Sequence, residues 1–198
     1  IGNGAYQLNL LIDMILASTL PDGSISFLYY ADRVNQLPLG VLGIAISTAL
    51  LPILSKQVKE NKSKDANNSI SKAIEFAVFF SIPSFVGILF LSEEIIKFLF
   101  FRGEFDITDV HLTAKALIAL SFGLPAFILI KILVVPFFAN ENTKTPIQIS
   151  VFCMIVNLIL NLILINKFLH VGLAIATSVS AWINVIILSY YLILKEKY

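Results

Sequence analysis

The sequence has few charged residues, a single cysteine and none of the common catalytic signatures. Aspartate, glutamate, lysine and arginine together make up 14% of the 198 residues, whereas a soluble domain carries roughly 25%. The single cysteine, Cys153, excludes an intrachain disulfide and a CxxC metal site. No HExxH, GxSxG, Walker A or GxGxxG motif occurs, so nothing supports an enzyme. A net charge of +1 likewise gives no electrostatic argument for a nucleic-acid partner.

Hydrophobic residues, in contrast, make up 58% of the chain, and the mean hydropathy is +0.88. A helix needs about 20 mostly apolar residues to cross a membrane, and six stretches qualify. We therefore predict an all-α fold, a polytopic bundle of about six transmembrane helices that forms a single unit over residues 1–198. The predicted spans are residues 4–20, 24–55, 73–91, 112–138, 146–165 and 171–194.

Helix breakers and charges mark the boundaries of these spans. Pro21-Asp22-Gly23 predicts a turn after the first span. Pro38 and Pro52 lie inside the second span, where neighbouring helices can satisfy the backbone groups that proline leaves free. Residues 92–111 mix aromatic and charged residues and are too short to span, which favours an interfacial segment on the periplasmic side. Because the chain begins with Ile1 inside an apolar run, we expect a piece of a longer protein.

The loop lysines and arginines favour one orientation in the membrane. Cytoplasmic loops carry an excess of these residues. If the first span starts in the cytoplasm, eight basic residues face the cytoplasm and three face the outside. We therefore expect both ends of the chain on the cytoplasmic side. The cytoplasmic set is Lys56, Lys59, Lys62, Lys64, Lys72, Lys144, Lys195 and Lys197, and the outer set is Lys97, Arg102 and Lys167.

Arg33 is an arginine inside a predicted span. It lies about 13 Å of helix beyond Ser24, near the middle of the membrane, where an ionisable group costs about 2.5–3.5 kcal/mol on insertion scales. Its guanidinium keeps its charge and can hold phosphate in a bidentate fork. We interpret Arg33 as an anion-binding group facing a water-filled cavity. A structural pair with Asp32 or with a residue of another helix is the alternative, although consecutive helix residues such as Asp32 and Arg33 point about 100° apart.

Four oxygen-bearing side chains lie at membrane depth in three different spans. Asp13 is in the first span, Asn157 and Asn161 share one face of the fifth, and Thr177 is in the sixth. Carboxylate, amide and hydroxyl oxygens are ligands for a hard cation such as Na⁺. One hypothesis is a small-cation site that joins these spans. The other is interhelical hydrogen bonding, in which asparagine and threonine hold membrane helices together.

Lys131, in the fourth predicted span, also has two interpretations. It lies seven residues before Phe138, so its side chain can extend to the inner interface while its stem stays in the apolar region. It can equally line a cavity and contribute to substrate binding.

Several short motifs give the chain a specific resemblance. The most specific is the run Tyr29-Tyr30-Ala31-Asp32-Arg33 followed by Leu37-Pro38-Leu39-Gly40-Val41-Leu42-Gly43-Ile44-Ala45. The others are Leu51-Pro52-Ile53-Leu54-Ser55, Phe101-Arg102-Gly103-Glu104-Phe105, Lys131-Ile132-Leu133 and Asn142-Thr143-Lys144-Thr145-Pro146. With these motifs the chain resembles the MurJ (MviN) lipid II flippases of the MOP transporter superfamily over essentially all 198 residues.

The resemblance implies an activity and a place in a larger protein. Family members have fourteen spans, in two six-helix lobes plus two extra helices, and this chain would be the second lobe, without the N-terminal lobe. The implied substrate is lipid II, an undecaprenyl-diphosphate-linked peptidoglycan precursor, moved from the cytoplasmic to the periplasmic leaflet of the bacterial inner membrane for cell-wall synthesis. Such a protein is a transporter and works among membrane lipids. Arg33 inherits a role in binding the diphosphate.

The resemblance also implies a candidate Na⁺ site. Some members bind Na⁺ at positions matched here by Asp13, Asn157, Asn161 and Thr177, with the Leu173 carbonyl as a further ligand. Asn161 stands where an aspartate can occur, which removes one negative charge. The nearest alternative function is another MOP-type carrier, an O-antigen or polysaccharide-lipid flippase or a cation-coupled drug antiporter. A membrane scaffold without transport is the alternative from another class.

Overall fold

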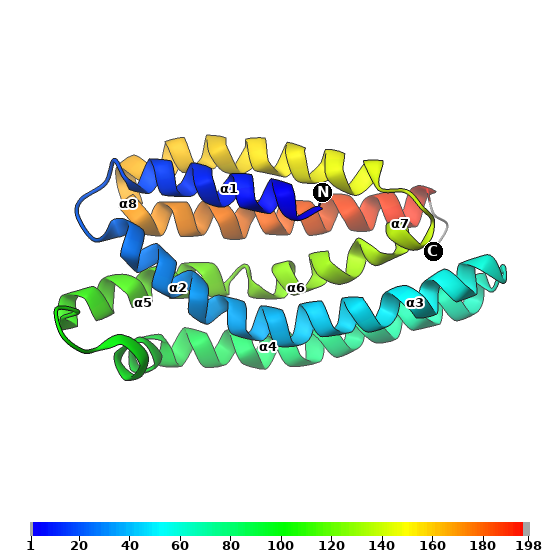
Figure 1. The fold of residues 1–198 in the computed structure, drawn as a ribbon, viewed down its shortest axis with the longest axis horizontal. Helices are drawn as coiled ribbons and strands as arrows, with labels where there is room; N and C mark the ends of the chain where they lie inside the picture. The colour runs from blue at the N-terminus through cyan, green and yellow to red at the C-terminus, as the bar shows by residue number, and fades with distance from the viewer. Residues whose placement is uncertain (1, 196–198) are drawn as a thin grey trace.

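The computed structural model describes the backbone of residues 2–195 and the side chains of residues 9 and 11–194. No strand occurs in this part of the chain, so the predicted all-α fold is confirmed. The helices run side by side along the long axis of the molecule (Figure 1). They are α1 (Gly2–Ala17), α2 (Ser24–Pro38), the π-helix η1 (Leu39–Ile44), α3 (Ala45–Lys59), α4 (Ser63–Phe100), α5 (Ile107–Ser121), α6 (Leu124–Leu133), α7 (Val135–Ala139) and α8 (Lys144–Lys195).

Several of these helices join into longer rods. α2, η1 and α3 form one apolar rod over Ser24–Lys59 that is long enough to cross a membrane, as is α4. α5 is followed by α6 and α7 after a bend of 41°, which makes a broken span. Pro38 ends α2 where η1 begins, and its missing N–H removes one i→i−4 hydrogen bond at this junction.

α8 is a hairpin of two antiparallel arms. A straight helix of its 52 residues would be about 78 Å long, more than twice the thickness of the bilayer core. The backbone turns at Leu169, with φ 51° and ψ −134°, and divides α8 into a first arm (residues 144–168) and a second arm (residues 170–195) (Figure 1). With α1 and both arms, the described chain crosses the bundle six times, in agreement with the predicted fold class.

The segment 92–111 begins with a helix that is set off from the rest of α4. The backbone breaks at Leu91 (φ −112°, ψ 16°), which coincides with the predicted end of the third span, and the helix after the break ends at Phe100. The interfacial location of this segment stays a prediction. α5 already begins at Ile107, five residues before the predicted fourth span. The reason is a capping box, in which the Asp106 and Asp109 side chains each accept a hydrogen bond from the other's backbone N–H.

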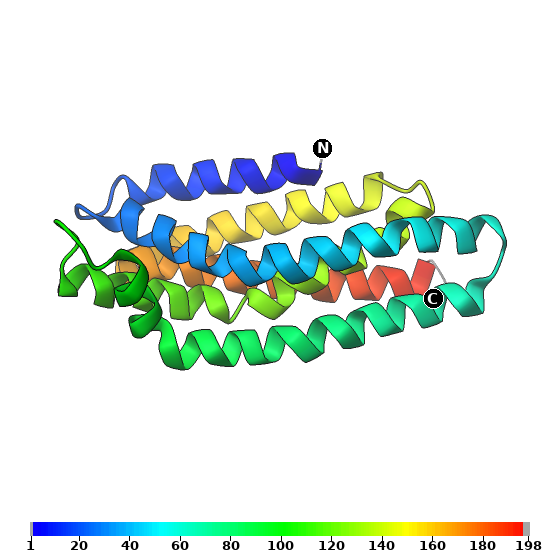
Figure 2. The ribbon, with the colours of Figure 1, turned by 60° about the horizontal axis from the view of Figure 1, so that its bottom comes forward.

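The two ends of the bundle carry different connections. The α1–α2 and α4–α5 connections and the turn of α8 lie at one end, which we call the turn end. The α3–α4 and α7–α8 connections lie at the other, which we call the basic end because Lys56, Lys59, Lys62, Lys64 and Lys144 belong to it. α1 and α4 lie on opposite sides of the bundle in both views (Figure 2).

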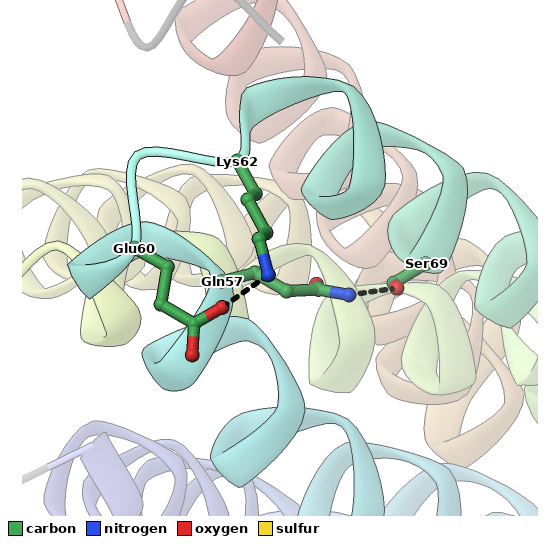
Figure 3. Close-up of polar contacts among 4 residues, drawn as sticks. All are labelled: Gln57, Glu60, Lys62 and Ser69. Atoms are coloured by element: carbon green, nitrogen blue, oxygen red, sulfur yellow. Dashed lines mark hydrogen bonds and ion pairs between the residues drawn. The ribbon is translucent and has the colours of Figure 1, made fainter.

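A small polar network ties α3 to α4 at the basic end (Figure 3). Gln57 donates a hydrogen bond of 3.0 Å to Ser69, and Lys62 forms an ion pair of 2.6 Å with Glu60 in the connecting turn. The hydrogen bond and the positive charge of Lys62 lower the pKa of Glu60. Of the predicted cytoplasmic set, Lys197 lies outside the described residues, as does the side chain of Lys195.

Candidate functional site

The candidate cation ligands from three predicted spans lie together in the structure. Asn161 Nδ2 donates hydrogen bonds to Asp13 Oδ1 at 2.7 Å and to Asn157 Oδ1 at 2.9 Å. Thr177 Oγ1 lies 3.4 Å from Asp13 Oδ2 and donates to the Leu173 carbonyl at 3.0 Å. We call this group of Asp13, Asn157, Asn161, Leu173 and Thr177 the polar cluster.

The α8 hairpin and α1 together build the polar cluster. Asn157 and Asn161 are four residues apart and therefore share a face of the first arm. The turn at Leu169 brings the second arm back along that face, and Asn157 Nδ2 contacts Thr177 Oγ1 at 3.3 Å. α1 packs against α8 and contributes Asp13. The cluster thus joins residues as far as 164 positions apart in the sequence.

Three further polar residues, which the sequence interpretation missed, extend the polar cluster towards the basic end. Ser180 Oγ lies 3.4 Å from Asn157 Nδ2. Asn9, one helical turn before Asp13, and Asn184, one turn after Ser180, each carry a buried side-chain oxygen without a hydrogen-bond partner. The spacing of four residues in both helices was a signal in the sequence that placed them on the same faces.

The polar cluster has the chemistry of a small-cation site. Its donor atoms are hard oxygens of a carboxylate, amides, a hydroxyl and a backbone carbonyl, the types that Na⁺ prefers. Asn161 is fully buried, yet its Oδ1 has no hydrogen-bond partner. A half-turn of this amide would bring Oδ1 to the positions now held by Nδ2, beside oxygens of Asp13 and Asn157. These oxygens repel one another when no cation is present, and they attract a cation placed between them. The residues present therefore fit a small cation.

Among the described residues, no three histidine, cysteine, aspartate or glutamate side chains form a group that could hold a metal ion. A site built from nitrogen, sulfur or several carboxylate ligands is therefore absent from this part of the chain. The polar cluster has a single carboxylate and therefore belongs to a different class.

Arg33 lies on an exposed face of α2. Its guanidinium stacks on the Tyr29 ring, with 4.7 Å from Cζ to the ring centroid, and Nη1 lies 3.4 Å from Gln36 Oε1. The exposed residues Tyr29, Leu37 and Val41 follow the same side of α2 and η1 at helical spacing. Arg33 thus projects from a face that no described helix covers, with its donors available to an anion. No direct ion pair with Asp32 forms among the described residues.

Asp32 has a different environment from Arg33. Its side chain is half-buried and accepts a hydrogen bond from Gln36 Nε2. This contact of Asp32 was not predicted, although the spacing of four residues between Asp32 and Gln36 is typical of a pair on one helix face.

Lys131 lies in α6, separate from the polar cluster. Its side chain is half-buried, and its stem packs beside Gly43 of η1, where an added Cβ would lie 3.4 Å from Lys131 Cγ. Lys131 has no ion-pair partner among the described residues. Its contribution to a substrate site stays a prediction.

Comparisons with known proteins identify the family of the whole chain. A sequence model of a family described as Lipid II flippase MurJ matches residues 1–198. The probable lipid II flippase MurJ of Rickettsia prowazekii (strain Madrid E) is 42% identical over 191 residues, which cover 96% of this chain and 38% of that protein. The corresponding Vibrio cholerae protein is 40% identical over 187 residues, or 94% of this chain and 36% of that one. The chain thus spans less than two fifths of these curated relatives.

Solved structures agree with this result. A lipid II flippase MurJ in an inward closed conformation superposes with a TM-score of 0.86 at 36% identity, covering 95% of this chain and 40% of that one. An outward-facing multidrug-resistance MATE transporter of the MOP superfamily also gives a TM-score of 0.86, at 17% identity, over 98% of this chain and 43% of that one. The second likeness concerns the fold alone.

Proposed function

The chain belongs to the family described as Lipid II flippase MurJ, and from this membership we propose that it forms one lobe of a lipid II flippase. The parent protein would move an undecaprenyl-diphosphate-linked peptidoglycan precursor from the cytoplasmic to the periplasmic leaflet of the bacterial inner membrane. No bond of the substrate changes, so this is transport and not enzymatic catalysis. The observation that carries the proposal is Arg33, an arginine within an apolar rod whose guanidinium projects from an uncovered helix face.

Arg33 would bind the diphosphate of the substrate. A guanidinium presents two parallel N–H donors to phosphate oxygens, and its charge balances part of the charge of the diphosphate. When no diphosphate is bound, stacking on the Tyr29 ring would hold the guanidinium in place. Lys131 would add a second positive charge to the wall of the cavity.

The uncovered face of α2 and η1 would form one side of the cavity, and the other lobe of the parent protein the opposite side. Transporters built from repeated bundles rock one bundle against the other around a central site, which opens it to each side in turn. The apolar residues exposed along this face, Tyr29, Leu37 and Val41 among them, are suited to the lipid part of the substrate.

The polar cluster would bind Na⁺ as a coupling ion. Asp13 provides the charge, and Asn157, Asn161, Thr177 and the Leu173 carbonyl complete an oxygen shell. Binding there would hold α1 against both arms of α8, because the ligands come from all three segments. A cation could in this way bias the return step of the transport cycle.

Growth after depletion of the cell's own lipid II flippase tests the proposed function. The full-length parent protein should restore growth, whereas its Arg33→Ala variant should not restore growth at equal expression. Normal growth with Arg33→Ala would exclude the diphosphate role of Arg33. Failure of the unchanged parent protein to restore growth would favour another MOP-type carrier or a scaffold without transport.

Thermal unfolding of the purified parent protein tests the cation site separately. Na⁺ should raise the melting temperature relative to equal concentrations of choline, and Asp13→Ala should remove this effect. If stabilisation by Na⁺ survives Asp13→Ala, the ion binds elsewhere.

A further inference from the structure

A groove lies between α5 and the second arm of α8 at the turn end of the bundle, where Figure 1 shows α5 and the turn of α8. The two helices pack against each other. The groove has a volume of about 770 Å³, which is typical of ligand sites. Its lining comes mainly from residues 112–122 and 170–182. At 1.5 Å per residue, the groove follows these segments for about 15–18 Å.

The polar side chains deep in the groove are hydrogen-bonded to the backbone of the opposite segment. Trp182 Nε1 donates to the Phe122 carbonyl at 2.9 Å, and Ser178 Oγ donates to the Ala119 carbonyl at 2.7 Å. These carbonyls lie at the end of α5, where a helix leaves its last carbonyls without internal partners. An apolar chain lying there would therefore leave neither Trp182 nor Ser178 without a hydrogen-bond partner.

Two lysines line the groove near the end of the bundle. Lys115 belongs to α5, and Lys167 belongs to the first arm of α8, just before its turn. Both side chains are exposed, and neither forms an ion pair among the described residues. The described residues that line the groove include no aspartate or glutamate. The mouth of the groove is therefore positively charged.

A hydrogen bond holds the two lysine-bearing segments together. His170 Nε2 lies 3.1 Å from the Leu112 carbonyl and is the donor, because a carbonyl only accepts. His170 follows Lys167 by three residues, and Leu112 precedes Lys115 by three residues. The ring of Phe27 packs on the His170 ring, with 5.4 Å between the centroids. These contacts keep both lysines at the same end of the groove.

We propose that this groove binds an anionic phospholipid such as phosphatidylglycerol. Its phosphate would lie at Lys115 and Lys167, and one acyl chain would follow the groove towards Trp182. The distribution of charge carries the proposal, because the cationic mouth lies at the end of the bundle, where a membrane surface lies, and the apolar part lies at the depth of acyl chains. The groove is separate from Arg33 and from the polar cluster, so this inference goes beyond the proposed function and does not rest on it.

Thermal unfolding of the full-length parent protein in a neutral detergent measures its affinity for dioleoyl phosphatidylglycerol and for dioleoyl phosphatidylcholine, which has the same chains. A lysine near a membrane surface strengthens the binding of an anionic lipid about fivefold, so two lysines predict a preference of about 25-fold for phosphatidylglycerol. Equal affinity for the two lipids would overturn the proposal. Glycerol 1-phosphate, which lacks the chains, should not raise the melting temperature. Stabilisation as strong as that by the lipid would instead indicate a site for free phosphate.

Paired charge variants test the two lysines. Lys115→Gln combined with Lys167→Gln should reduce the preference to less than about threefold, because glutamine keeps a similar length without the charge. Lys97→Gln combined with Arg102→Gln is the matched control, since both positions are exposed at the turn end and neither lines the groove. The control should keep the full preference. An equal loss in both double variants would show attraction to the general surface charge and would overturn the site.

A bulky side chain tests the apolar part of the groove. Val179 is exposed and lines the groove, so Val179→Trp should occupy the space of the acyl chain and weaken the binding of phosphatidylglycerol about tenfold or more. Ile186→Trp is the matched control, because Ile186 is exposed two turns later on the same arm and lies outside the groove. Unchanged binding by Val179→Trp would contradict the proposed position of the chain.

A phosphatidylglycerol with a diazirine on one acyl chain gives a test without mutation. In the parent protein it should label residues 112–122 and 170–182, and unlabelled phosphatidylglycerol should reduce the labelling. Labelling confined to other segments would mean that another part of the parent protein covers the groove, and it would overturn the proposal. None of these outcomes changes the roles of Arg33 and Asp13, which the growth and Na⁺ measurements test separately.

Discussion

Asp32 and Arg33 are neighbours in the sequence and face different environments in the structure. The guanidinium of Arg33 stacks on Tyr29 at an exposed face, whereas Asp32 is half-buried and hydrogen-bonded to Gln36. Consecutive helix positions differ by about 100° in direction, so one turn of α2 can supply both an anion-binding group and an acidic group directed inward.

Arg33→Lys should weaken diphosphate binding about tenfold or more, equivalent to about 1.4 kcal/mol. Lysine keeps the charge but loses the planar pair of donors that matches two phosphate oxygens. The measurement is the affinity of the parent protein for undecaprenyl diphosphate. Arg102→Lys, at an exposed position of the α4–α5 connection, is the matched control and should bind normally. Equal affinity of the Arg33→Lys variant would show that charge alone suffices.

Asn161→Asp should tighten Na⁺ binding about tenfold, because a second carboxylate joins Asp13 in a buried site. In the absence of a cation, the two carboxylates, now close together in place of the hydrogen bond of 2.7 Å, should lower the melting temperature. The predicted result is a larger Na⁺-dependent rise in melting temperature. Asn68→Asp, at an exposed position of α4, controls for the added charge. An unchanged response to Na⁺ would argue against a cation in the polar cluster.

At the scale of the helices, the turn of α8 depends on a close approach between its two arms. A Cβ at Gly172 would lie only 2.7 Å from the backbone oxygen of Leu164. Only glycine allows two helix backbones to approach this closely, a common arrangement in membrane proteins. The turn itself is a single residue, Leu169, in a backbone conformation with positive φ.

Gly172→Ala should therefore destabilise the protein by about 1–3 kcal/mol, the usual cost of overpacking. The backbone of Leu164 cannot move aside as a flexible side chain would. Gly87→Ala is the matched control, because no atom lies within 4 Å of its added Cβ; it should be neutral or stabilising by up to about 1 kcal/mol. Thermal unfolding of both variants gives the measurement, and similar melting temperatures would contradict the close approach.

At the scale of the whole molecule, the described lysines of the predicted cytoplasmic set cluster towards one end of the bundle. Lys56, Lys59, Lys62, Lys64 and Lys144 lie in or beside the connections at the basic end, whereas Arg102 lies at the turn end. We propose from this distribution that the basic end faces the cytoplasm. Cys153 is buried, so its replacement by alanine gives a background without cysteine for a test of orientation.

Single cysteines in the Cys153→Ala background should report the two sides of the membrane. Arg102→Cys should react with a membrane-impermeant maleimide added to cells with a permeabilised outer envelope and an intact inner membrane. Lys62→Cys should react only after lysis. Both positions are exposed, so a difference in labelling reflects sidedness. The reverse labelling pattern would require the opposite orientation.

The helical class, most of the apolar segments and the residues of the polar cluster follow from the sequence alone. Hydropathy and spacing of three to four residues are local properties, so Pro21-Asp22-Gly23 predicted the turn between α1 and α2, where Ser24 N–H bonds to the Pro21 carbonyl. The pair Asn157 and Asn161 could likewise be placed on one helix face from their spacing of four residues. Arg33 was identified in the same way, from its position inside an apolar segment.

Which of these faces meet is a property of the tertiary structure. The bond between Asn161 and Asp13 joins residues 148 positions apart, and its formation depends on the packing of α1 against both arms of α8. The same packing brought in Asn9, Ser180 and Asn184. Helix periodicity gives the direction of a side chain relative to its own helix, whereas the partner across the interface depends on the arrangement of the whole bundle.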